Sequence, residues 1–78
     1  MEKRFNQEIK AFGVHLRKLR EAKGLSQLDL ELECGINRTE ISRIENGQKN
    51  IEFFTMVKLA VALRVELGDF FGKEGRTK

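Results

Sequence analysis

The sequence contains no proline, and it has one cysteine and one histidine in 78 residues. The absence of proline favours long uninterrupted helices over turn-rich sheet folds. A single cysteine excludes an internal disulfide framework. With only one histidine beside it, the chain also lacks the usual ligand set of a structural zinc site. No metal or cofactor is therefore expected.

Long apolar runs are missing as well. The longest is far shorter than the roughly 20 residues that a membrane-spanning helix needs. The chain does not open with a charged segment followed by an apolar one, which is the pattern of a secretory signal. We therefore expect a cytoplasmic location and no membrane contact.

The remaining composition predicts one small domain over residues 1–78. Hydrophobic residues make up 40% and charged residues 35%, which is too apolar for disorder, and the length allows one core near the lower limit of size. No nucleophile–base pair, metal cluster or phosphate-binding loop is visible. A chain this short also has little room for a pocket of typical volume. Neither an enzyme nor a small-molecule ligand is expected.

The charged residues are unevenly distributed along the chain. The net charge of +3, from 15 basic and 12 acidic residues, is by itself a weak argument for a polyanionic partner. Basic residues crowd 17–23 and recur over 38–49, whereas 29–33 carries three acidic residues and no basic one. This distribution suggests one face reserved for a partner.

An amphipathic helix is predicted from about Asn6 to Lys23, and Gly24 would end it. Its apolar residues recur at alternating steps of four and three, as in a helix with one buried stripe. The stripe consists of Phe5, Ile9, Phe12, Leu16 and Leu19.

Two short helices follow, each with its own start and stop signals. Ser26 is a good N-cap with Asp29 at the third helical position, close to a capping box, and Gly35 would end this helix. Asn37 caps the next helix, with Glu40 three residues later. This helix is expected over residues 38–46, before Gly47. Two capped helices with a three-residue break predict a helix-turn-helix at about 26–46.

Two further helices complete an all-α fold of five helices. They are expected over residues 53–63 and 67–71, followed by a polar tail over 72–78. In the first of them, the expected core stripe is Phe53, Met56 or Val57, Ala60 and Leu63.

The helix over 38–46 carries an unusual polar side. On a helical wheel Ile41, Ile44 and Glu45 face the core. The opposite side presents hydrogen-bond donors, namely Arg38, Thr39, Ser42, Arg43 and Asn46. The major groove of DNA admits a helix, arginine matches the two acceptors of guanine, and threonine or serine can contact base edges. A DNA-reading surface is favoured, and a merely solvated face is the alternative.

The segment "GLSQLDLELECGINRTEISRIENG" (24–47) resembles the helix-turn-helix of the Xre/Cro family of bacterial and phage repressors. The similarity extends from about residue 16 to residue 71. Within the family, "RTEIS" and "KNI" resemble the controller proteins of restriction–modification systems. The resemblance implies a five-helix bundle of the lambda-repressor-like type. It also implies a transcriptional regulator that binds palindromic double-stranded DNA as a homodimer, with half-sites roughly 34 Å apart.

The resemblance also implies roles for individual residues. The positions that match base contacts are Arg38, Thr39 and Arg43, with Ser42 between them. The positions that match phosphate contacts are Gln27, Asn46 and Lys49. Arg20 and Glu45 match a partly buried ion pair between the first and third helices. Three residues depart from the family pattern: Glu31 replaces the usual alanine, Arg64 replaces a helix-ending glycine, and Cys34 replaces a small apolar residue. A carboxylate at position 31 is expected to point outward or to push the two helices apart.

A dimer surface is expected on the fourth helix, where apolar residues fall off the core stripe. These are Phe54, Val61 and Val65, which Phe70 and Phe71 would extend. Alternatively, Phe54 turns inward and Phe53 outward, which would give an ordinary core. The same surface also fits a second hypothesis, an antitoxin-like or other interaction subunit whose main partner is another small protein.

Overall fold

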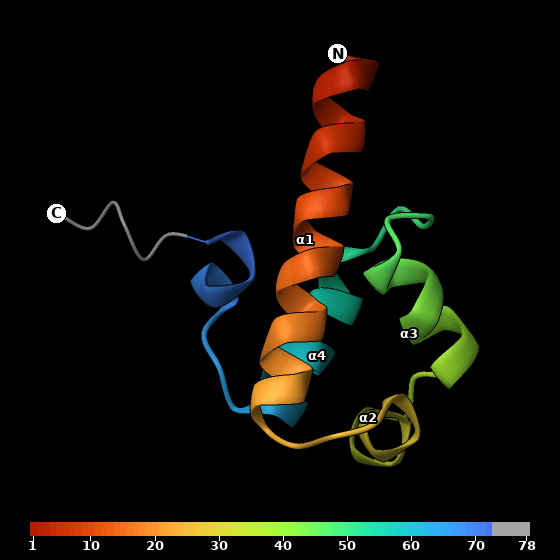
Figure 1. Cartoon of the computed structure of the whole chain (residues 1–78), viewed down its shortest axis with the longest axis vertical. Helices are drawn as coiled ribbons and strands as arrows, with labels where there is room; N and C mark the ends of the chain where they lie inside the picture. The colour runs from red at the N-terminus through yellow and green to blue at the C-terminus, as the bar shows by residue number, and fades with distance from the viewer. Residues whose placement is uncertain (73–78) are drawn as a thin grey trace, which may run out of the picture.

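The computed structural model describes residues 1–72, and within them the chain forms four α-helices, a final 3-10 helix and no strand (Figure 1). The elements are α1 (Glu2–Ala22), α2 (Gln27–Cys34), α3 (Arg38–Glu45), α4 (Phe53–Leu63) and η1 (Leu67–Phe71). The predicted all-α class is confirmed. The predicted count of five helices is not confirmed as such, because the last of them, expected over 67–71, is a 3-10 helix. Of the predicted tail over 72–78, all residues beyond Gly72 lie outside the described part of the chain.

Helix α1 is the longest helix of the described residues. It packs against α3 and η1, while α2 packs against α3 and α4, and its first turns extend beyond the rest of the molecule (Figure 1). The helix begins at Glu2 rather than at about Asn6. Its start has no side-chain cap, but an ion pair between Arg4 Nε and Glu8 Oε2 at 2.8 Å supports it. Phe5, expected in the buried stripe, lies in this extension and is 42% exposed.

The core takes side chains from every element. Its buried members are Phe12, Leu16, Leu30, Ile36, Ile41, Ile44, Leu59, Ala60, Leu63 and Phe70. The backbones of α1 and α3 approach closely at Gly13, where an added Cβ would lie 2.6 Å from the carbonyl oxygen of Glu45. Glycine at this position therefore allows the two helices to pack at the distance that the core requires.

Helix α4 presents most of the predicted stripe to the core, because Ala60 and Leu63 are buried and Met56 packs against the core. Phe53, expected in the core, is 66% exposed, whereas Leu59 is fully buried. Ile51 in the preceding loop packs against the core together with Met56. Phe53 itself is not part of the core.

Phe70 is fully buried and packs against Phe12, with 4.9 Å between the ring centroids. The prediction that Phe70 extends a dimer surface is therefore wrong. Phe71, its neighbour, is 40% exposed. In the tight turn of a 3-10 helix, one of two adjacent aromatic side chains enters the core and the other remains near the surface.

The caps of the helix-turn-helix follow the predicted pattern. Ser26 Oγ accepts the N–H of Asp29, and Asp29 Oδ2 accepts the N–H of Ser26, both at 2.9 Å. Gly35 ends α2 with a φ of 77°, a conformation that glycine adopts at little cost. Arg64 ends α4 in the same left-handed region, with a φ of 60°. Arg64 thus adopts the left-handed backbone conformation that a glycine usually supplies at such a helix end.

None of the helices within residues 1–72 is long and apolar enough to cross a membrane.

Candidate nucleic-acid interface

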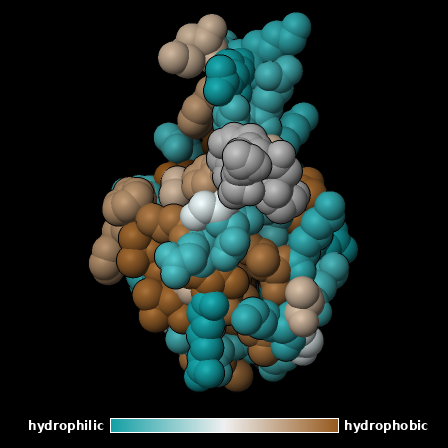
Figure 2. Space-filling model, turned by 90° about the vertical axis from the view of Figure 1, so that its left-hand side faces the viewer, coloured by the Kyte–Doolittle hydropathy of each residue, from teal (hydrophilic) through white to brown (hydrophobic). Residues whose placement is uncertain are grey.

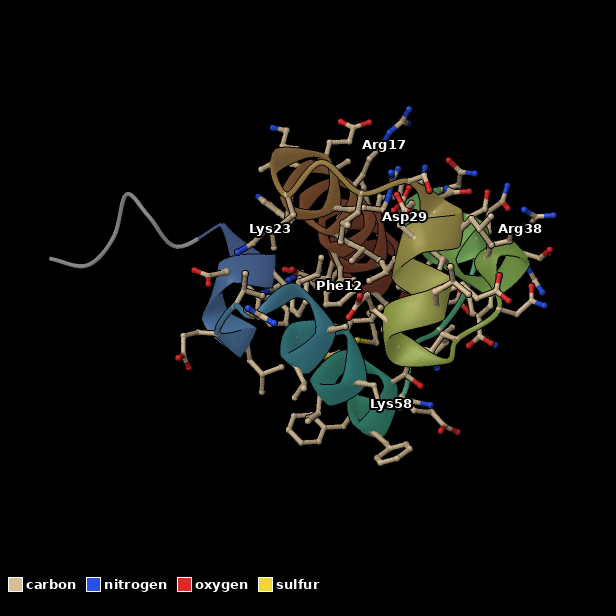
Figure 3. The ribbon with its side chains drawn as sticks, turned by 90° about the horizontal axis from the view of Figure 1, so that it is seen from below. Phe12, Arg17, Lys23, Asp29, Arg38 and Lys58 are labelled. Carbon is tan, nitrogen blue, oxygen red and sulfur yellow. The ribbon has the colours of Figure 1, made fainter. Side chains whose placement is uncertain are left out.

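The two sides of α3 differ sharply in burial. Ile41, Ile44 and Glu45 are buried, whereas the expected base-contacting residues Arg38, Thr39 and Arg43 are exposed and Ser42 is half-buried. Arg38 projects from the outer edge formed by α2 and α3 (Figure 3). The polar side of α3 is therefore open to solvent along its length.

The two arginines of this side have their charges available. No salt bridge among residues 1–72 involves Arg38 or Arg43. A guanidinium group offers a rigid fork of donors that fits two acceptors at once, either on a guanine edge or on a phosphate. The exposed side of α3 can therefore bind an acceptor-rich surface without first breaking an internal ion pair.

Arg20 and Glu45 form the ion pair that the resemblance implies. Arg20 Nε and Nη2 donate to Glu45 Oε2 and Oε1 at 2.7 and 3.1 Å, and their side chains are only 9% and 2% exposed. Arg20 Nη1 also donates to the carbonyl oxygen of Leu25 at 2.7 Å. The hydrogen bond that Arg20 donates to Glu45 raises the pKa of Arg20. This contact fixes α3 to α1 behind the exposed polar side.

Gln27, expected to contact a phosphate, also belongs to this network. Its Nε2 donates to Glu45 Oε1 at 3.0 Å, and the residue is half-buried at the start of α2. The side chain is therefore held in one orientation beside the surface that α3 presents.

Glu31 does not point outward, which was one of the two expectations for it, but turns toward the start of α3. Its Oε1 accepts the backbone N–H of Arg38 at 3.0 Å. Asn37 Oδ1 accepts the N–H of Thr39 at 2.7 Å, as its predicted cap role requires. Glu40 does not complete a capping box with Asn37. It forms an ion pair with Lys49, with 3.9 Å between Oε2 and Nζ. The start of α3 is thus held by one side chain from α2 and one from the turn.

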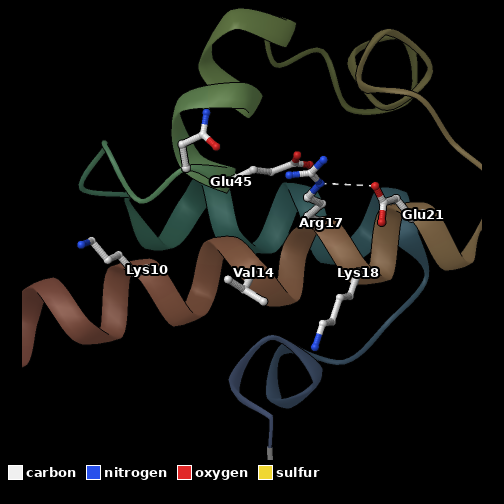
Figure 4. A pocket seen from close by; sticks show the side chains of 7 residues that line it. Lys10, Val14, Arg17, Lys18, Glu21 and Glu45 are labelled. Atoms are coloured by element: carbon white, nitrogen blue, oxygen red, sulfur yellow. Dashed lines mark hydrogen bonds and ion pairs between the residues drawn. The ribbon is translucent and has the colours of Figure 1, made fainter.

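A groove of about 490 Å³ runs between α1 and the C-terminal end of α3 (Figure 4). It is lined by Asn46, an expected phosphate contact, and by basic residues of α1 that include Lys10 and Arg17. Arg17 turns toward Glu21, with 3.3 Å between Nε and Oε2. No role was predicted for Lys10, because nothing local in the sequence indicates that it lies beside the end of α3.

A separate apolar surface lies on α4. Phe54 is 69% and Val61 71% exposed, as expected for a surface off the core stripe. Val65 is half-buried and packs against the core. Exposed Phe53 adds to this surface, which the predicted register did not anticipate. A view from the side of η1 shows apolar side chains gathered over the body of the molecule (Figure 2).

Comparison with known proteins agrees with this geometry. The helix-turn-helix family model matches residues 16–70, which is more than half of the chain. The chain belongs to this family of DNA-binding transcription regulators.

Two curated members of the family are similar to the chain over most of their length. Control protein C.MunI from Mycoplasma sp is 36% identical over 77% of this chain and 82% of its own. Control protein C.BamHI from Bacillus amyloliquefaciens is 39% identical over 74% of this chain and 73% of its own. The resemblance to controller proteins is therefore supported by whole-domain similarity.

A solved structure has the same fold as this helix-turn-helix protein. It is the restriction-modification controller protein C.AhdI from Aeromonas hydrophila, with a TM-score of 0.80 and 40% identity. The match covers 83% of this chain and 98% of that one. The arrangement of helices around the helix-turn-helix is thus shared between the two proteins.

Proposed function

We propose that the chain is a sequence-specific transcriptional regulator which binds a palindromic double-stranded DNA operator as a homodimer. The observation that carries the proposal is the open polar side of α3, with Arg38 and Arg43 free of ion pairs among the described residues. Similarity to control proteins adds support for a regulator of the controller kind.

In this proposal α3 enters the major groove and reads bases through four residues, Arg38, Thr39, Ser42 and Arg43. The arginines would each bond a guanine edge, and the two hydroxyl groups would bond a base edge or touch a thymine methyl group. Ile41 and Ile44 hold the opposite side of α3 in the core, so the orientation of the reading side is set by packing.

Phosphates would be contacted on either side of α3 by Gln27, Asn46 and Lys49. Gln27 uses one amide proton for Glu45, which leaves the second for a phosphate oxygen. Lys10 and Arg17 line the groove beside Asn46, so their charges add to the attraction for the DNA backbone there.

Homodimerisation would occur through the apolar surface of α4, with Phe53, Phe54 and Val61 at its centre and Val65 at its margin. Lys58 of α4 projects from a different edge of the molecule from Arg38 (Figure 3). Pairing through α4 therefore leaves the reading side of α3 free in both copies. A two-fold dimer would bind half-sites about 34 Å apart, or a multiple of that distance.

The test is selection of bound sequences from a random DNA pool, combined with sedimentation of the free protein. We expect a palindromic consensus and a dimer in solution. Equal affinity for the selected DNA and for scrambled duplexes would refute the regulator. A monomer that binds a single half-site would refute only the homodimer. Co-purification of a stoichiometric small protein on α4 would assign that surface to a different partner.

A further inference from the structure

Glu31 reaches from α2 across the turn and holds the first residue of α3. Its carboxylate accepts the backbone N–H of Arg38 at 3.0 Å, and Asn37 accepts that of Thr39 at 2.7 Å. Two of the amides that open α3 are thus satisfied by oxygen atoms of the protein itself. One of those oxygen atoms carries a negative charge.

The open amides of a helix start form a ready site for phosphate, because their partial positive charges add to the helix dipole. On a helix that enters DNA, such a site can bind any backbone phosphate, so it adds affinity that carries no sequence information. In this protein the Glu31 carboxylate already occupies part of that position. It would repel a phosphate that approaches the start of α3.

We propose that Glu31 is a positioning residue that increases the discrimination between a specific operator and random DNA. The inference rests on the proposed function of α3. By bonding the amide of Arg38, Glu31 sets the orientation in which α3 leaves the turn. By its charge, it disfavours binding modes in which the helix start sits on the DNA backbone. Modes in which the side chains of Arg38 and Arg43 reach the base edges are affected less.

The test separates the charge of Glu31 from its hydrogen bond. Glu31→Gln keeps an oxygen that can accept the Arg38 N–H but removes the charge. We expect its affinity for scrambled duplex to rise roughly two- to five-fold, the effect of a charge at a helix end, with a smaller change for the selected operator. The ratio of the two affinities should fall accordingly. Fluorescence anisotropy with duplexes of equal length, at three salt concentrations, measures both.

A matched control removes the same charge elsewhere on α2. Glu33 is exposed near the C-terminal end of that helix, so Glu33→Gln reports the effect of net charge alone. Equal effects of the two substitutions on scrambled duplex, or an unchanged ratio in Glu31→Gln, would overturn the proposal.

Glu31→Ala removes the charge and the hydrogen-bond acceptor together. We expect Glu31→Ala to bind the operator more weakly than the unaltered protein does. Glu31→Gln should restore operator binding, but its ratio of operator to scrambled affinity should stay low. Recovery of full discrimination in Glu31→Gln would instead show that only the hydrogen bond matters, against the proposal. If the unaltered protein itself prefers no sequence, the proposed function fails and this inference fails with it. Failure of the inference alone leaves the discrimination of the unaltered protein intact.

Discussion

Arg20 Nε lies 2.7 Å from Glu45 Oε2, and this buried contact joins α1 to α3. Removing one partner leaves the other charge buried without compensation, which typically costs about 3–5 kcal/mol. We therefore expect Glu45→Ala to destabilise the fold by roughly that amount in urea unfolding. The double variant Arg20→Met, Glu45→Leu should be markedly more stable than Glu45→Ala alone. Equal stability of the single and double variants would contradict a coupled pair.

The close approach of α1 and α3 at Gly13 predicts a second stability effect. A Cβ at this position would lie 2.6 Å from the carbonyl oxygen of Glu45, so the two backbones must separate to admit it. Gly13→Ala should lower the free energy of unfolding by about 1–3 kcal/mol, as overpacking typically does. Alanine is otherwise the better helix former, so Gly68→Ala, at a site with no atom within 4 Å of an added Cβ, is the control. A more stable Gly13→Ala would show that the approach is not constrained.

The capping box of α2 predicts a pH-dependent contribution to stability. The backbone N–H of Ser26 donates to Asp29 and lowers the pKa of its carboxyl group below the ordinary value of 3.8. The folded state thus favours the charged form, so Asp29 contributes stability above pH 3.8. That contribution is lost as the pH falls through the lower folded pKa. At pH 6 the midpoint temperature of thermal unfolding should be higher for the unaltered protein than for Asp29→Asn. At low pH the difference between the two midpoints should disappear. A difference that is independent of pH would contradict this origin.

The parts of the fold that were predicted correctly depend on local signals. Ser26, Gly35 and Asn37 act within a few positions of their own helices, and each is where the pattern indicates. The start of α1 was missed because its first residue has no capping side chain. The Glu31–Arg38 contact was missed for another reason: it spans seven positions across a turn.

In α4 and η1 the apolar periodicity did not predict correctly which of two adjacent aromatic residues is buried. A pattern of apolar positions does not say which of two neighbouring rings enters the core. Phe53 and Phe54 both lie outside, while Ile51 and Met56 pack against the core. Phe70 lies inside because Phe12 of α1 packs against it. Such outcomes depend on elements distant in the sequence.

The proposed dimer predicts that charge on α4 produces monomers. Phe54 and Val61 are 69% and 71% exposed, so Phe54→Glu with Val61→Glu should leave the monomer folded by circular dichroism. Sedimentation should show a single monomeric species, because two carboxylates per copy would face each other in an apolar interface. Leu32→Glu, on an equally exposed residue of α2, is the control and should remain dimeric. Dimers in the double variant would place the interface elsewhere.

The two kinds of DNA contact predict different responses to substitution. Arg43→Ala removes a proposed base contact, so it should cost about 1–3 kcal/mol at the selected operator and relax sequence preference at one position of each half-site. Lys49→Ala removes a proposed phosphate contact, so it should weaken binding to all duplexes about equally and lower the salt slope by about one. Arg4→Ala, a charge-matched change in the exposed first turn of α1, is the control for net charge. Anisotropy titrations on operator and scrambled duplexes over a range of salt separate the three patterns. Equal losses on operator and scrambled DNA for Arg43→Ala would move this residue from base reading to backbone contact.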